Sequence, residues 1–176
     1  WVLDDITLDM QDDGTACVTN CFQSATSVDI PAEVDGVTIS GIQEGAFSQC
    51  FLLESLTLPD TITTIQDSAF YGCSVLKKLE IPDSVTSMGK GTMEACIALT
   101  DVKLPSTLDT LPTSTFYGCT ALETVSFPEA MNTIGSEAFY QCTALKDVDL
   151  SQIATIETYA FEGCSALTDI TIPVSY

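Results

Sequence analysis

The chain contains no histidine and no arginine, and five lysines carry all of its positive side-chain charge. Histidine is the commonest general base and a frequent metal ligand, so its absence argues against an enzyme. The sequence also lacks G-x-S-x-G, S-x-x-K and Ser-His-Asp arrangements, and it has no glycine-rich phosphate loop. We therefore expect no catalytic residue, no metal and no cofactor.

Positive charge is scarce beside 25 aspartates and glutamates, which give a formal net charge of −20. This charge repels phosphate backbones and anionic lipid headgroups, so nucleic acid and membrane surfaces are poor partners, and we expect neither nucleic-acid binding nor membrane insertion. No apolar run approaches the length of a membrane-spanning helix, and the first residues lack the basic flank and apolar run of a signal peptide. An exported protein would therefore be represented here by a mature form or a fragment.

What the chain does contain is a repeat, AFxxCxxLxxLxLP, which is seen in full at residues 69–82 and returns about every 23 residues. This period, with LxxLxL spacing, predicts a leucine-rich solenoid in which short strands stack in parallel. The predicted strands are Leu56–Leu58, Leu79–Ile81, Val102–Leu104, Val125–Phe127, Val148–Leu150 and Ile170–Ile172. A second apolar pair in each coil, such as Ile62 and Ile65, fits a second short strand or a tight turn. The Ala-Phe-x-x-Cys segment fits one helical turn.

Stacking of equivalent coils predicts two interior columns of apolar side chains. The phenylalanine column contains Phe47, Phe70, Met93, Phe116, Phe139 and Phe161, and the leucine column contains Leu53, Leu76, Leu99, Leu122, Leu145 and Leu167. Residues 1–27 do not fit the repeat and alternate around Asp12-Asp13-Gly14, which predicts a β-hairpin that caps the stack. We therefore divide the chain into an N-terminal cap, 1–27, and a solenoid of about six to seven coils, 28–176.

The repeat AFxxCxxLxxLxLPxxhxxI (h apolar) over residues 28–176 resembles the BspA-like, or Treponema pallidum-type, class of leucine-rich repeats. Compared with the family, this sequence departs in three ways: Met93 replaces Phe, Ser151 replaces Pro, and every regular coil contains a cysteine. The resemblance implies a right-handed curved solenoid with a parallel sheet on its concave face, typically in cell-surface or secreted proteins of bacteria and some protists. Members resemble adhesins, and the family has no catalytic motif to carry over.

Six of the eight cysteines occupy one column: Cys50, Cys73, Cys96, Cys119, Cys142 and Cys164. Stacked side chains point in parallel, which separates their Cβ atoms by more than a disulfide accepts, and the CxxC knuckle of zinc sites is absent. We therefore predict buried, unreactive thiols. Cys17 and Cys21 lie outside this column, and two interpretations stay open: they bond to each other, or both are unpaired.

The strand face presents two columns of outward side chains, which form the candidate binding surface. Its residues are Ser55, Thr57, Lys78, Glu80, Asp101, Lys103, Thr124, Ser126, Asp147, Asp149, Asp169 and Thr171. Stacking sets Lys78 beside Asp101 and Glu80 beside Lys103, which would be favourable cross-strand pairs. The face is either a solvated surface kept polar against aggregation or an acidic binding strip, and parallel columns do not form a calcium cage.

Three tyrosines, Tyr71, Tyr117 and Tyr140, directly follow the phenylalanine-column position, and we expect them to face outward. They either cover the adjacent turn, which we favour, or form an aromatic partner site.

The favoured function is a non-enzymatic extracellular interaction or adhesion module that binds a protein or glycan, on another cell or in a host matrix, at the concave face. The alternative is a structural spacer, or a fragment of a larger cell-surface protein with no ligand of its own. The sequence ends after a predicted strand, so either the natural chain continues or two copies meet end to end as a homodimer.

Overall fold

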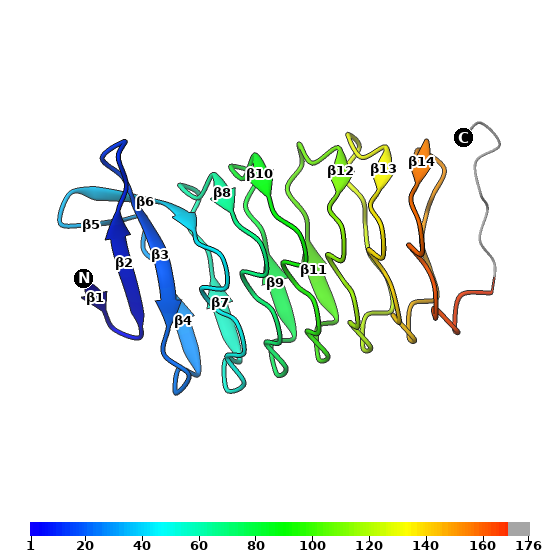
Figure 1. The fold of residues 1–176 in the computed structure, drawn as a ribbon, viewed down its shortest axis with the longest axis horizontal. Helices are drawn as coiled ribbons and strands as arrows, with labels where there is room; N and C mark the ends of the chain where they lie inside the picture. The colour runs from blue at the N-terminus through cyan, green and yellow to red at the C-terminus, as the bar shows by residue number, and fades with distance from the viewer. Residues whose placement is uncertain (169–176) are drawn as a thin grey trace.

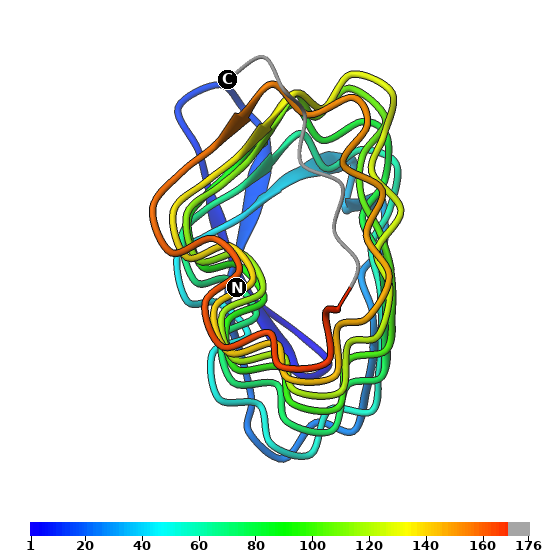
Figure 2. The same cartoon turned by 90° about the vertical axis from the view of Figure 1, so that its right-hand side faces the viewer.

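The protein is a stack of coils, seen from the side in Figure 1 and along the stack in Figure 2, where successive coils superimpose as one outline. The structure, a computed structural model, describes residues 1–168; the predicted strand Ile170–Ile172 and the candidate residues Asp169 and Thr171 lie outside the described part. Within residues 1–168 no helix is long and apolar enough to cross a membrane. The predicted repeat solenoid is confirmed.

The chain begins with three antiparallel strands, which include the predicted hairpin. They are β1 (Val2–Leu3), β2 (Ile6–Met10) and β3 (Ala16–Cys21). Strand β3 then pairs in parallel with β6 (Val37–Ile42), so that the hairpin continues directly into the solenoid. A short antiparallel pair joins β5 (Glu33–Val34) to β6 around the Asp35-Gly36 turn. The hairpin is confirmed, whereas the division of the chain at residues 27 and 28 stays a prediction.

Two rows of parallel strands run along the stack, and we name them the first and second walls. The first wall contains β4 (Ser27–Asp29), β7 (Ser55–Thr57), β9 (Lys78–Glu80) and β11 (Asp101–Lys103). The second wall contains β6, β8 (Thr64–Ile65), β10 (Ser87–Met88), β12 (Thr110–Leu111), β13 (Thr133–Ile134) and β14 (Thr155–Ile156). The second apolar pair of each coil is therefore a short strand rather than a tight turn alone.

The second wall has a break between β10 and β12 that follows from one residue. Gly89 and Gly135 donate their N–H groups to the preceding coil, at Ile65 O and Leu111 O, over 2.8 Å in both cases. Pro112 stands at the equivalent position between them and has no N–H to donate. The ladder therefore stops at Pro112 and resumes one coil later.

The helical turn predicted for the Ala-Phe-x-x-Cys segment is wrong: this segment is a series of turns without helix. Alternate N–H groups donate across to the next coil, as Phe47 N does to Ala69 O over 2.7 Å and Phe70 N to Thr92 O over 2.8 Å. The N–H groups between them close single turns along the chain, as Cys73 N does to Phe70 O over 3.3 Å. Left-handed backbone at Ser68 (φ 56°) and Gly72 (φ 69°) turns these groups along the stack. Neither residue fits a right-handed helix.

Both interior columns are confirmed by burial and ring contacts. Phe47, Phe70, Phe116 and Phe139 are fully buried, as is Met93. Ring centroids lie 5.7 Å apart for Phe47 and Phe70 and 5.3 Å apart for Phe116 and Phe139. The leucine column is fully buried from Leu53 to Leu145 and partly buried at Leu167. Each buried Phe or Leu contributes about 1.5–3 kcal/mol by transfer from water, so these columns dominate the stability.

Candidate functional site

The first wall presents its predicted residues to solvent because strand residues alternate in direction. Leu56 and Leu79, at the centres of β7 and β9, are buried, whereas their neighbours in sequence face outward. The ten described candidates are all exposed: Ser55, Thr57, Lys78, Glu80, Asp101, Lys103, Thr124, Ser126, Asp147 and Asp149. The outward direction of these residues is as the repeat predicted. However, the first wall continues beyond β11 without regular strands: the predicted strands Val125–Phe127 and Val148–Leu150 are not formed, and only an isolated bridge joins Thr124 to Asp147. The role of the wall in binding stays a prediction.

A hollow of about 630 Å³ lies over β7, β9 and β11 on this wall. It brings together half of the described candidates, namely Ser55, Thr57, Lys78, Glu80 and Lys103. Asp101, Thr124, Ser126, Asp147 and Asp149 do not line it. Four further polar residues line the hollow and were not among the candidates: Glu54, Asp60, Asp83 and Ser84. Asp60 and Asp83 directly follow the coil prolines Pro59 and Pro82.

Ion pairing in the hollow differs from the predicted cross-strand pairs. The register places Lys78 opposite Asp101 and Glu80 opposite Lys103, as expected. However, Lys78 Nζ pairs with Glu80 Oε1 of its own strand at 3.3 Å, and Lys103 Nζ pairs with Asp83 Oδ1 at 3.1 Å. Residues two apart on a strand share a face, and a long lysine side chain spans that distance. The predicted pairs are therefore wrong, although the alignment behind them is right.

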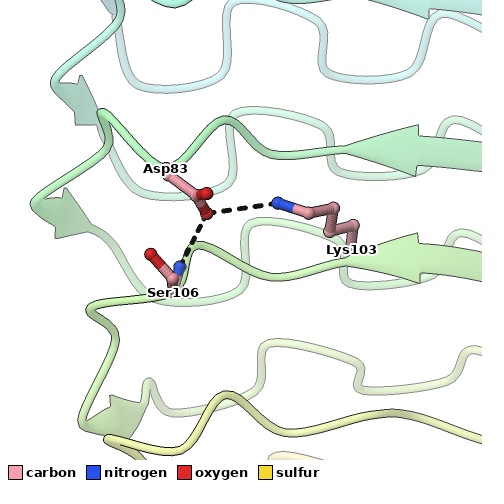
Figure 3. A network of polar contacts seen from close by, with 3 residues as sticks. All are labelled: Asp83, Lys103 and Ser106. Carbon is pink, nitrogen blue, oxygen red and sulfur yellow. Dashed lines mark hydrogen bonds and ion pairs between the residues drawn. The ribbon is translucent and has the colours of Figure 1, made fainter.

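Asp83 is held from two sides (Figure 3). The Ser106 N–H donates to Asp83 Oδ1 over 2.9 Å, and the Lys103 ammonium donates to the same oxygen over 3.1 Å. The Ser106 backbone bond, with the Lys103 bond, lowers the pKa of Asp83. Because Ser106 belongs to the next coil, these contacts fix one edge of the hollow across two coils.

The far end of the first wall is acidic. An isolated parallel bridge joins Thr124 to Asp147, and the Ser151 N–H donates to Asp149 Oδ1 over 3.0 Å, which lowers the pKa of Asp149. The ion pairs formed within residues 1–168 do not include Asp147 or Asp149. No group of three or more metal-ligating side chains in this part of the chain is placed to hold a metal ion.

The cysteine column consists of free, buried thiols, as predicted, and the structure adds a role that the sequence did not reveal. From Cys73 onward, each thiol donates to the main-chain carbonyl at the phenylalanine-column position of the preceding coil. The donors and acceptors are Cys73 to Phe47 (3.2 Å), Cys96 to Phe70 (3.2 Å), Cys119 to Met93 (3.1 Å), Cys142 to Phe116 (3.0 Å) and Cys164 to Phe139 (3.0 Å). The constant offset of about one coil was visible in the sequence, but the direction of the carbonyls was not.

The question left open for Cys17 and Cys21 is answered by their position. Both lie on strand β3, four residues apart, and both are free. At about 3.3 Å per residue their Cα atoms are about 13 Å apart, well beyond the reach of a disulfide. A bond between them is therefore excluded.

The three tyrosines pack over the turns beside them. Tyr117 and Tyr140 stack with ring centroids 4.7 Å apart, and all three tyrosines, Tyr71 included, are half-buried. This arrangement favours the interpretation that the tyrosines cover the adjacent turns rather than form a partner site.

Comparisons with known proteins agree with the architecture. The sequence pattern of the BspA type leucine rich repeat region matches residues 40–168 in six copies. A leucine-rich repeat protein of Treponema pallidum superposes with a TM-score of 0.81 at 22% identity, over 96% of this chain and 91% of that one.

Two further solved structures are longer than this chain. A leucine-rich repeat protein of Eubacterium ventriosum matches with a TM-score of 0.80 at 28% identity, over 96% of this chain and 46% of its own. The pneumococcal vaccine antigen PcpA matches with a TM-score of 0.52 at 20% identity, over 85% of this chain and 45% of its own. No curated protein matches the chain.

Proposed function

Because the chain belongs to the BspA-type leucine-rich repeat family, we propose that it is a non-enzymatic interaction module that binds a protein or glycan on its first wall. Leucine-rich repeat proteins generally mediate protein interactions, since a solenoid offers a long, regular surface. In this proposal the partner lies on another cell or in a host matrix, and the protein acts at the cell surface or outside the cell.

The observation that carries the proposal is the hollow over β7, β9 and β11. Its rim combines four carboxylates, Glu54, Asp60, Glu80 and Asp83, with two lysines, Lys78 and Lys103. Hydrogen bonds between coils and within the ladders hold the backbone beneath these side chains. A surface fixed before binding loses little entropy when a partner docks, so a modest contact area can still bind specifically.

The mixed charge also indicates the kind of contact. Both lysines in the hollow are already paired with carboxylates, at 3.3 and 3.1 Å. Glu54 and Asp60 lie outside these pairs, so the hollow favours a partner that offers hydrogen-bond donors or positive charge. Hydroxyl groups of a glycan or basic side chains of a protein meet that requirement.

One variant pair tests this proposal against a spacer, which the elongated shape of the stack also suits (Figure 1). Thr57→Arg places a long side chain in the hollow, and Ser87→Arg places the same side chain on β10 of the second wall; both residues are exposed. The protein is applied to arrays of matrix proteins and glycans, and Kd is measured for each ligand found. We expect Thr57→Arg to weaken binding at least about tenfold, a loss of about 1.4 kcal/mol, and Ser87→Arg to leave it unchanged. Equal effects of the two variants, or no bound ligand at all, would favour the spacer.

A second variant separates the hollow from the acidic end. Replacing Asp147 and Asp149 by lysine reverses the charge of the outward pair one coil beyond Thr124 and Ser126. If a basic partner extends along the whole wall, its affinity falls; if only the hollow binds, the affinity is retained.

A further inference from the structure

Cys21 occupies a place in the stack that belongs to phenylalanine in most other coils. Its N–H donates to Ala46 O over 2.8 Å, the same inter-coil bond that Phe47 N makes to Ala69 O over 2.7 Å. Its carbonyl oxygen faces the thiol of Cys50, just as the Phe47 carbonyl faces the thiol of Cys73. The phenylalanine column therefore begins with a cysteine at its N-terminal end, and this cysteine lies against the first member of the cysteine column.

The two thiols at this junction also have the longest hydrogen bonds of the series. Cys50 Sγ lies 4.0 Å from Cys21 O, whereas Sγ lies 3.0–3.2 Å from its acceptor for Cys73 through Cys164. Cys21 Sγ lies 3.6 Å from Phe22 O. Oxidation removes the thiol hydrogen, so these two residues lose less by it than the column cysteines that follow. Both are buried and separated by 29 residues of chain.

We propose that Cys21 and Cys50 are a modification site, at which a disulfide joins strand β3 to the first cysteine-bearing coil under oxidising conditions. A hydrogen bond between the two thiols lowers the pKa of Cys50 and raises that of Cys21, whereas burial raises the pKa of Cys73, Cys96 and Cys142. The attacking species in thiol–disulfide exchange is the thiolate, so Cys50 is the nucleophile of the pair.

The reaction needs a disulfide oxidant, for which glutathione disulfide serves as the probe. The Cys50 thiolate attacks one sulfur of that disulfide, which forms a mixed disulfide and releases one glutathione thiolate. The Cys21 thiolate then attacks the Cys50 sulfur of the mixed disulfide and releases the second glutathione. Two protein thiols are oxidised, one glutathione disulfide is reduced, and the two protons pass to the released glutathiones.

The disulfide would lock the N-terminal strands over the interior of the stack. Strand β3 covers the coil that contains Ile42 and Phe47, both fully buried. A crosslink between residues 21 and 50 closes a loop that contains β4, β5 and β6, which restricts the unfolded chain and stabilises the fold. The later column cysteines keep their thiols, because equivalent side chains in neighbouring coils point in parallel.

The test refolds the full chain from urea in a glutathione redox buffer and counts thiols under denaturing, non-reducing conditions. We expect the count to fall from the eight free cysteines of the structure to six, with peptide mapping linking Cys21 to Cys50 and a higher Tm than that of the reduced protein. In the matched variants, Cys17→Ser loses two thiols on oxidation, whereas Cys50→Ser and Cys21→Ser lose none to an internal bond. Eight remaining thiols, glutathione adducts alone, or a link between any other pair would overturn the proposal.

Discussion

Alkaline pH should unfold this protein through its cysteine column. Burial raises the pKa of six thiols, and four of these have no exposed surface: Cys73, Cys96, Cys119 and Cys142. Burial brings the pKa of Cys96 and Cys142 to about 12 from an ordinary value of 9.0. A thiol whose pKa is raised on folding makes its full contribution to stability at pH values below its pKa in the unfolded chain. That stabilisation is lost as the pH rises from about 9 towards 12, because the unfolded chain releases protons that the native chain keeps.

The size of the effect follows from the four thiols. One proton retained by the native state lowers the free energy of unfolding by about 1.4 kcal/mol per pH unit, so four lower it by about 5.5 kcal/mol per unit once the unfolded thiols ionise. At about pH 10 the loss relative to neutral pH is about 6 kcal/mol, a large part of the 5–15 kcal/mol that typically stabilises a domain. We therefore expect the unfolding midpoint to lie between about pH 10 and 11.

Urea unfolding followed by circular dichroism between about pH 8 and 10.5, with a phosphine reductant present, measures this slope directly. The Cys96→Ala variant removes one titrating thiol and should reduce the slope by about 1.4 kcal/mol per pH unit. The exposed Ser55→Ala variant serves as the control and should leave the slope unchanged. If the wild-type slope is near zero, or if Cys96→Ala has the wild-type slope, the thiols do not stay protonated in the fold and the reasoning fails.

Three further pairs of variants test the packing, each by urea unfolding at neutral pH. Gly89→Ala would bring a Cβ within 2.5 Å of Asp67 N and 2.8 Å of Gln66 C, so we expect a loss of more than about 2 kcal/mol, while Gly41→Ala, with 3.5 Å to its nearest neighbour, should cost less than about 1 kcal/mol. Thr92→Val removes a buried hydroxyl that has no hydrogen-bond partner and should stabilise by about 1 kcal/mol. Thr115→Val removes a hydroxyl that donates to Pro112 O over 2.7 Å and should destabilise by about 1 kcal/mol; equal effects would contradict the assignment. Ala95→Gly relieves a left-handed residue (φ 61°) and should stabilise by about 0.5–1 kcal/mol, whereas Ala138→Gly, at a fully buried position, should destabilise.

The repeat period predicted most of the fold because stacking turns spacing in the sequence into position in space. Once Phe116 and Phe139 occur one period apart, they must share a column, and the burial and ring stacking confirm it. The outward direction of Lys78 and Glu80 followed from strand alternation around Leu79 in the same way.

The turns and the contacts between side chains could not be predicted from spacing. The Ala-Phe-x-x-Cys segment has the apolar pattern of a helical turn, but stacked coils offer its N–H groups acceptors in the next coil, and left-handed residues such as Ser68 direct them there. Lys103 has two carboxylates within reach, and the choice of Asp83 depends on the Ser106 N–H that fixes it. The proximity of Cys21 to Cys50 arises from a hairpin that lies outside the repeat, so the period does not reveal it.

Inward and outward residues of each coil have different roles, and the outward residues determine which partner can bind. Phe70, Leu76 and Cys73 have counterparts in almost every coil because each must match the residue stacked on it, and a change there costs packing. The outward position held by Lys78 has no such constraint. The equivalent position is Ser55 one coil earlier and Asp147 near the far end of the wall. Because the backbone beneath repeats while these side chains do not, the first wall changes from mixed charge at the hollow to negative charge at its far end. A partner that recognises this gradient would bind in one direction and one register, which a uniform polar face could not enforce.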